Sequence, residues 1–247
     1  MEKKTAIVTG ASSGIGKAIA KLFLSKGFNV IMNSSNEELL QKTFKEFGSP
    51  PNAKAIAGDV ADKNTGQKLV DAAIKYFGAL DVLVNNAGAF AAKPFLDVEE
   101  KELDHFYNIN LKGTFFCAQA AIKAMQEKGG SIINIGTVLV DHAIVGFPAT
   151  AAVASKGGIH ALTKQLAAEF GKKNIRVNTI APGIIRSPLQ EKLGVKDADV
   201  MAGLHLLNRI GETTDIAEMT YYLATSNFIT GEIMNVDGGH VAGHVFA

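Results

Sequence analysis

Three glycines cluster near the start of the chain, in the segment Thr9-Gly10-Ala11-Ser12-Ser13-Gly14-Ile15-Gly16. Glycine permits a tight turn and lets the backbone approach a ligand closely, because no side chain intervenes. A β-branched run, Thr5–Thr9, precedes the cluster, and the helical pattern Ile15–Lys26 follows it. Backbone N–H groups at the start of a helix favour negative charge. The segment therefore predicts a cradle for the pyrophosphate of a dinucleotide, and a purely structural turn is the alternative.

Short β-branched runs alternate with longer helical patterns along the whole chain. Strands are expected at Thr5–Thr9, Asn29–Met32, Lys54–Ala57, Val82–Asn85, Ser131–Ile135, Arg176–Ala181 and Glu232–Val236. Helices are expected at Ile15–Lys26, Glu37–Phe47, Gly66–Phe77, from the capping-box-like Asp97 and Glu100 to about Met125, Ala151–Phe170 and Asp215–Ala224. This alternation predicts βαβ crossovers and an α/β fold with a mainly parallel sheet.

No linker rich in Pro, Gly or Ser divides the chain, so we expect a single domain over residues 1–247. Residues from about 184 to 214 fit neither the helical nor the strand period. A connection of that length in a compact domain is typically a lid or a binding loop.

Composition and charge exclude several classes of partner. The 247 residues carry 25 Lys and Arg against 24 Asp and Glu, a net charge of +1, which gives no electrostatic footprint for nucleic acid or an anionic membrane. The one cysteine, Cys117, excludes an internal disulfide and is expected to be a small buried residue. No apolar run could span a bilayer, and none follows the charged start as in a signal peptide. We therefore expect a cytoplasmic protein.

Further motifs follow the glycine turn in order along the chain. They are Asp59-Val60, Asn85-Asn86-Ala87-Gly88, Asn110-Leu111-Lys112-Gly113, Ile175–Gly183 with its Pro182-Gly183 turn, and Gly231–Gly239. With the spacing T-G-x-x-x-G-x-G in the turn, these motifs resemble the short-chain dehydrogenase/reductase family over nearly the whole chain. The resemblance implies a Rossmann-type, doubly wound sheet of seven strands with helices on both faces. It also implies a homotetramer or homodimer in which the long helices Glu99–Met125 and Ala151–Phe170 pair across subunits.

In that family a nicotinamide cofactor exchanges a hydride with a small-molecule carbonyl or alcohol. The implied cofactor-binding residues are Gly10, Ser12, Ser13, Gly14, Ile15, Gly16, Asp59, Val60, Asn86, Ala87, Gly88, Lys156, Pro182, Gly183 and Ile185.

The ribose end of the cofactor is expected to face Ser34-Ser35-Asn36, after the second strand. An acidic residue here would bind the 2′-OH of NAD and repel a 2′-phosphate, and no carboxylate precedes Glu37. The hydroxyls of Ser34 and Ser35 could donate hydrogen bonds to that phosphate, although no Arg or Lys accompanies them and a plain polar turn is the alternative. The segment favours NADP(H), with NAD(H) still open.

The catalytic motif of the family is only partly present. Thr137 falls where the family has a serine that polarises the carbonyl, Lys156 matches the lysine that holds the nicotinamide ribose, and Asn110 matches the asparagine of the proton relay. The tyrosine that delivers the proton stands four residues before this lysine, and here that position is Ala152. We therefore expect an atypical active site.

Three other features bear on the site. His142 lies in a segment, 138–150, that is slightly longer than usual, and it is either a substitute proton donor beside the substrate or a solvated loop histidine. Arg186 could pair with a substrate carboxylate or the cofactor pyrophosphate, or be a solvated surface arginine. His240 and His244 lie four apart without a helix or an acidic partner, so no metal site is expected.

Two functions of different class remain. The first is an oxidoreductase that uses NADP(H) on a carbonyl or alcohol, and the second is a cofactor-binding protein without redox activity, such as a sensor or assembly subunit. The retained Lys156 and Asn110 favour the first, whereas Ala152 favours the second.

Overall fold

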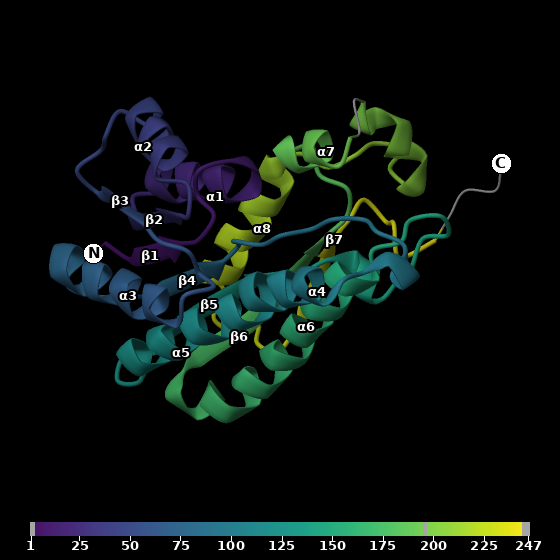
Figure 1. Cartoon of the computed structure of the whole chain (residues 1–247). Coiled ribbons are helices and arrows are strands. Elements are labelled where there is room, and N and C mark those ends of the chain that lie inside the picture. The colour runs from purple at the N-terminus through teal and green to yellow at the C-terminus, as the bar shows by residue number, and fades with distance from the viewer. Residues whose placement is uncertain (1–2, 195–196, 244–247) are drawn as a thin grey trace.

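A computed structural model of the chain describes residues 3–194 and 197–243 (Figure 1). Seven strands form its sheet: β1 (Thr5–Val8), β2 (Asn29–Ser34), β3 (Ala53–Ala57), β4 (Val82–Asn85), β5 (Gly130–Ile135), β6 (Ile175–Pro182) and β7 (Ile233–Val236). Their order is β3-β2-β1-β4-β5-β6-β7, and every neighbouring pair is parallel. The predicted doubly wound, seven-stranded fold is confirmed. The strand order reverses between β1 and β4, where ligands of such sheets bind.

Helices cover both faces of the sheet (Figure 1). They are α1 (Gly14–Ser25), α2 (Glu37–Glu46), α3 (Lys63–Phe77), α4 (Glu100–Phe106), α5 (Gly113–Met125), α6 (Thr150–Phe170), α7 (Pro188–Lys192) and α8 (Thr213–Thr225). Side chains alternate between the two faces of a strand, so neighbouring residues of β1 enter different cores. Val8 packs with Phe23 and Leu223 from α1 and α8, whereas Ile7 packs with residues of α3 and α5 on the other face.

One expected helix is broken into three parts. The capping box lies at Glu99 and Glu102, not at Asp97 and Glu100, because Asp97 ends a separate 3₁₀ turn over Phe95–Asp97. After α4 the backbone widens into a π-helical turn, Tyr107–Lys112, before α5 begins. A π-helical turn admits an extra residue and re-aims side chains, and such turns occur frequently at functional sites. This one contains Asn110.

The long connection after β6 contains the short helix α7 and a 3₁₀ helix over Ala198–Leu204. The two ends of this connection are joined by backbone hydrogen bonds. Gly211 donates to the carbonyl of Ile184 and accepts from the N–H of Arg186. Figure 1 shows the connection above the carboxyl ends of the strands.

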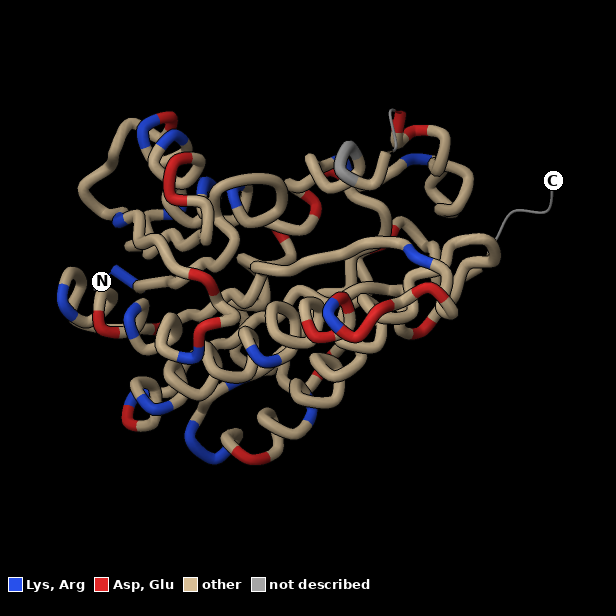
Figure 2. Tube along the Cα trace, in the orientation of Figure 1, with Lys and Arg blue, Asp and Glu red and all other residues tan. Residues whose placement is uncertain are grey.

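Acidic and basic residues are interspersed along the outer helices (Figure 2), as the net charge of +1 led us to expect. Cys117 is buried, and burial raises the pKa of its thiol to about 12, so it is inert at neutral pH. Within residues 3–194 and 197–243, no helix combines the length and the apolar character needed to cross a membrane.

Candidate cofactor and substrate site

The glycine turn is held against the end of β4 by Asn86. Its amide nitrogen donates to the carbonyls of Thr9, at 2.9 Å, and Gly10, at 3.3 Å. The hydroxyl of Thr9 accepts from the N–H groups of Asn86 and Ala87, both at 3.0 Å. Gly10 has a φ of +66°, which favours glycine. The turn is thereby fixed at the first residues of α1, whose N–H groups face an anion site.

Two glycines of the turn leave no room for a side chain. A Cβ at Gly16 would lie 2.3 Å from the carbonyl oxygen of Gly10, and a Cβ at Gly10 would lie 2.7 Å from the amide nitrogen of Asn86. The absence of these carbons lets the helix and strand approach closely while the rest of the turn borders open space. The turn therefore has the shape that a dinucleotide pyrophosphate requires, and the residues present fit that group.

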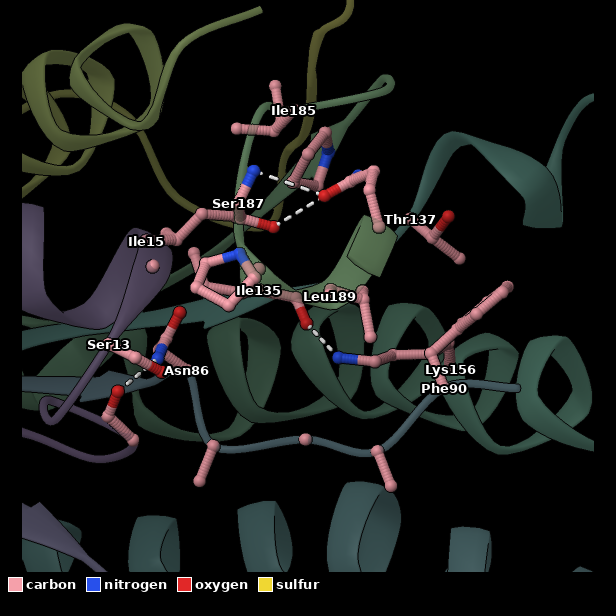
Figure 3. A pocket seen from close by; sticks show the side chains of 18 of the residues that line it. Ser13, Ile15, Asn86, Phe90, Ile135, Thr137, Lys156, Ile185, Ser187 and Leu189 are labelled. Atoms are coloured by element: carbon pink, nitrogen blue, oxygen red, sulfur yellow. Dashed lines mark hydrogen bonds between the residues drawn. The ribbon is translucent and has the colours of Figure 1, made fainter. Parts of the chain in front are cut away.

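A cleft of about 570 Å³ runs from this turn to the long connection after β6, along the carboxyl ends of the strands (Figure 3). The expected cofactor residues that border it are Gly10, Ser12, Ser13, Gly14, Ile15, Ser34, Ser35, Asp59, Val60, Asn86, Ala87, Gly88, Lys156, Pro182, Gly183 and Ile185. Gly16 packs behind the turn, as described above, and is outside that lining. Segments more than 170 residues apart in the sequence thus meet in one cavity.

The end of the cleft beside α2 is polar. The hydroxyls of Ser12 and Ser34 lie 2.9 Å apart and share a hydrogen bond, and the N–H of Asn36 donates to the Ser34 hydroxyl at 3.2 Å. Asn36 caps α2 by accepting from the N–H of Leu39. A helix start favours a bound anion, although Glu37 and Glu38 in the first turn offset part of that effect.

Lys156 enters the cleft from α6 and is only 7% exposed. Its ammonium group donates to the carbonyl of Ile135 at 2.6 Å (Figure 3). Gly88 lies between this lysine and Asn110: a Cβ there would be 3.2 Å from the lysine nitrogen and 3.1 Å from the asparagine oxygen. The three residues that match the family motifs are therefore neighbours, although they come from three separate segments.

Asn110 is fully buried and lies behind the cleft wall. Its side chain accepts from the N–H of Ala89 at 2.8 Å, and donates to the carbonyl of Ala89 at 2.9 Å and the hydroxyl of Ser155 at 2.8 Å. All of its amide hydrogens are used. Asn110 thus fixes the backbone of Ala89, which borders the cleft, to the helix that carries Lys156.

Thr137 borders the cleft at the end of β5, and its hydroxyl accepts from the N–H of Leu139 at 3.3 Å. Ala152 does not reach the cleft: it is fully buried in an apolar cluster with Phe106 and Ala151. Phe90 packs against that cluster and borders the cleft next to Lys156 (Figure 3). Phe90 thus belongs both to the surroundings of the Ala152 cluster and to the wall of the cleft.

Arg186 lies outside the lining of the cleft, and its side chain is 47% exposed. Its guanidinium group binds Asp199 at 2.6 Å and Glu212 at 3.0 Å, which raises its pKa above the ordinary value. Both partners come later in the chain, so the sequence pattern did not reveal them. Arg186 therefore links Asp199, in the 3₁₀ helix of the long connection, to Glu212 just before α8.

Two histidines at the site have roles that the sequence did not indicate. His240 is 1% exposed and borders the cleft, whereas His205 accepts from the N–H of Ile184 through Nε2 at 3.2 Å. His142, the expected substitute acid, is half-buried and lies with its ring against His240, at 5.1 Å between centroids. His244 lies outside the described residues. Among the residues the structure describes, no group of three His, Cys, Asp or Glu could hold a metal ion.

Burial lowers the pKa of Lys156 from 10.5 to about 8, so we expect a pH-dependent contribution to stability. Between these two values the unfolded chain binds more protons than the folded one, so stability rises with pH across that window and is lost as pH falls toward 8. The change amounts to roughly 3 kcal/mol over the full interval. Urea unfolding of the ligand-free protein at several pH values measures it, with Lys156→Met as the control that should show a flatter profile. Parallel profiles for the two proteins would contradict this expectation.

The fold is that of a doubly wound α/β protein with its cleft at the switch point. A family model described as enoyl-(acyl carrier protein) reductase matches residues 10–241. The chain is 36% identical over 246 residues to a 3-oxoacyl-(acyl-carrier-protein) reductase of Thermotoga maritima. The matched region covers 98% of this chain and 99% of that relative. It is 36% identical over 257 residues to an (S)-acetoin-forming diacetyl reductase of Staphylococcus epidermidis, with coverage of 96% and 98%.

Solved structures agree with these relatives. A short-chain type dehydrogenase/reductase from Mycobacterium marinum has a TM-score of 0.91 at 31% identity and covers 97% of this chain and 96% of that one. The structure of ElxO with NADP bound has a TM-score of 0.89 at 33% identity, with coverage of 98% and 100%. This chain belongs to the short-chain dehydrogenase/reductase family, whose members named here are oxidoreductases.

Proposed function

We propose that this protein transfers a hydride between NADP(H) and a small-molecule carbonyl or alcohol, with an active site that lacks the usual tyrosine. The observation that carries the proposal is the single cleft that joins the glycine turn, Lys156 and an apolar end lined by Phe90, Phe147 and Met201. Polar backbone at one end suits the cofactor, and an apolar end suits an uncharged substrate.

Different residues of the chain have different roles in this reaction. The turn from Gly10 to Gly16 holds the pyrophosphate, and Asp59 and Val60 lie at the adenine end. Lys156 binds the nicotinamide ribose, and the Thr137 hydroxyl polarises the substrate carbonyl. When bound, the cofactor supplies or accepts the hydride. Ala152 occupies the tyrosine position of the family motif, so the proton comes from elsewhere, and His142 is the donor that the sequence suggests.

Oxidation of NADPH, followed by its absorbance, tests this function with a panel of small ketones and α-dicarbonyls that includes 2,3-butanedione. Turnover that depends on Lys156 supports the proposal. NADPH binding without turnover on any member of the panel would favour the alternative, a cofactor-binding protein without redox activity. No feature of the cleft argues for that alternative beyond Ala152.

We expect NADPH to bind more tightly than NADH. The polar end of the cleft carries Ser12, Ser34 and Ser35, and Glu37 and Glu38 lie outside its lining, in the first turn of α2. The relative ElxO is solved with NADP, and a variant of it with NADPH. Dissociation constants from NADPH and NADH fluorescence titrations decide the matter. Replacing Ser34 by Asp should reverse the preference, because a carboxylate repels the 2′-phosphate. Tighter binding of NADH by the unchanged protein would contradict NADP(H) as the cofactor.

We also infer a single domain over residues 1–247, with the connection at about 184–214 as a lid over the substrate end. The backbone pair at Ile184 and Gly211 closes its base, and the Arg186 ion pairs hold its 3₁₀ helix to that base. Limited proteolysis should cut this connection first, and saturating NADPH should slow the cut. Cleavage that NADPH does not affect would argue against a lid.

We expect a homodimer or homotetramer through α5 and α6. The side chain of Phe115 on α5 is 44% exposed, and Phe116, Leu162 and Leu166 on these two helices are half-buried in the single chain. Burying such a surface against a second copy removes apolar area from water. Light scattering measures the mass directly, and Phe115→Glu should lower the mass toward that of one chain. A monomer mass for the unchanged protein would refute the assembly.

A further inference from the structure

His240 borders the cleft that also holds Lys156 and Thr137. It follows β7 directly after the Asp237-Gly238-Gly239 turn, and its side chain is almost fully buried. Its ring meets the ring of His142 edge to face, with centroids 5.1 Å apart and planes at 83°. On another side it meets His205 at 5.4 Å and 67°. Three imidazoles from three distant segments therefore share one contact cluster.

His205 differs from His142 and His240 in that one of its ring nitrogens accepts a hydrogen bond from the backbone. Its Nε2 accepts from the N–H of Ile184 at 3.2 Å, so the lone pair of this nitrogen is used in that bond. Protonation at Nε2 would break the bond that holds the start of the lid connection. His205 is therefore a positioning residue that fixes the wall beside His240, and the mobile proton belongs to the other pair.

His142 and His240 differ in exposure, and their rings are in contact. His142 is half-buried on the loop after the 3₁₀ turn Val138–Val140, whereas His240 is buried and borders the cleft. Charged groups lie in the same turn as His240 and at the same cleft. The Asp237 carboxylate, in its own turn, accepts from the N–H groups of Gly239 and Val241, at 3.0 and 2.9 Å, and Lys156 borders the same cleft from α6.

We propose that His240 is the proton donor for carbonyl reduction in this chain and that His142 returns a proton to it from solvent. The inference rests on the proposed function. As a C–H bond forms at the carbonyl carbon with the hydride supplied by NADPH, the electron pair of the C=O π bond moves to oxygen. That oxygen takes the proton from the His240 imidazolium. The neutral His240 is then reprotonated through His142 by water, and NADP⁺ is the oxidised product.

Other groups at the cleft are less suited to this step. Ala152 carries no proton, and the Thr137 hydroxyl is a weak acid. Lys156 directs its ammonium group to the Ile135 carbonyl, and its pKa of about 8 gives it a pH signature that can be told apart from that of a histidine, whose ordinary pKa is about 6.5. The competing donor is therefore Lys156, and pH separates the two.

A first experiment needs no turnover. NMR follows the Cε1–H signals of the histidines against pH in the protein with NADP⁺, with assignments from His→Gln variants. The inference predicts that NADP⁺ shifts the His240 signal and that His142→Phe changes the His240 titration, while the exposed His105 does neither. A His240 signal that responds to neither the cofactor nor His142→Phe would overturn the inference.

A second experiment measures kcat/KM for 2,3-butanedione against pH. In the unchanged protein the reduction rate should fall as pH rises past the histidine range, because the imidazolium is lost. His240→Gln should lower kcat/KM by roughly 10²–10⁴-fold, which is the usual contribution of a general acid. The rate of this variant should no longer fall as pH rises through the histidine range. Added imidazole should restore part of the rate in His240→Ala and none in His240→Phe, whose ring fills the space. His105→Gln is the matched control and should behave as the unchanged protein.

The possible failures are distinguishable. If His240→Gln keeps its rate and its pH profile falls near pH 8 as in the unchanged protein, Lys156 is the donor and the inference is wrong while the proposed function stands. If the unchanged protein binds NADPH but reduces no carbonyl of the panel, the proposed function fails, and the donor role fails with it. NADPH titration of each variant confirms that the site is still formed.

Discussion

Replacing Gly16 by alanine should abolish tight NADPH binding, with an expected loss of at least roughly 100-fold in affinity. The new Cβ would lie 2.3 Å from the carbonyl oxygen of Gly10 and 2.4 Å from the amide nitrogen of Asn86. The first atom belongs to the backbone, and the second donates a hydrogen bond to the carbonyl of Thr9. Neither atom can move away without disturbing the turn. The turn must shift as a unit, which misplaces the N–H groups at the start of α1.

Fluorescence titration with NADPH measures the effect, and thermal unfolding shows whether the fold survives. Gly171→Ala is the matched control, because nothing lies within 4 Å of a Cβ at that position and its φ is −57°. That variant should bind NADPH unchanged and be slightly more stable, by up to about 1 kcal/mol, since alanine restricts the unfolded chain. Equal NADPH affinity in Gly16→Ala and the unchanged protein would show that the turn does not hold the cofactor.

Much of the fold could be predicted from periodicity and turn residues. Strands such as β4 were located to the residue, because short β-branched runs between Gly- or Pro-containing turns have few other interpretations. The π-helical turn at Tyr107–Lys112 could not be predicted in this way. It accompanies side-chain bonds from Asn110 to Ala89 and Ser155, contacts that exist only after three segments have come together.

The cofactor half of the site was easier to predict than the substrate half. Glycine turns act through local backbone geometry, which sequence spacing encodes directly. The substrate half depends on side chains brought together by long connections, such as Phe90 against Phe147, whose rings stack at 6.1 Å. The partners of Arg186 could not be predicted for the same reason, since Asp199 and Glu212 come from later segments.

One signal for His240 was present in the sequence. The residue follows the Asp237-Gly238-Gly239 turn at the carboxyl end of the last strand, and all carboxyl ends of a parallel sheet meet at one edge. The place of His240 at this edge of the sheet, rather than its spacing to His244, is the feature of the sequence that predicts a position beside the cleft.

Restoring a tyrosine should also restore proton transfer, but only if space is made for it. Ala152 is fully buried in a cluster against which Phe90 packs, so Ala152→Tyr alone should destabilise the protein and add no activity. Phe90→Ala removes a ring that packs against this cluster and borders the cleft. We therefore expect Ala152→Tyr to act only together with Phe90→Ala.

The test is made in a background that lacks the proposed donor, His240→Gln with Phe90→Ala. There Ala152→Tyr should raise kcat/KM for 2,3-butanedione by roughly 10²–10⁴-fold, or about 3–5 kcal/mol of barrier, because a phenol beside Lys156 replaces the missing acid. Ala152→Phe in the same background fills equal space without a hydroxyl and should give no gain. The pH profile should follow the phenol instead of an imidazole. Equal rates for the tyrosine and phenylalanine variants would show that this position does not face the reacting carbonyl, and the alignment of Ala152 with the family's tyrosine would then have no catalytic meaning.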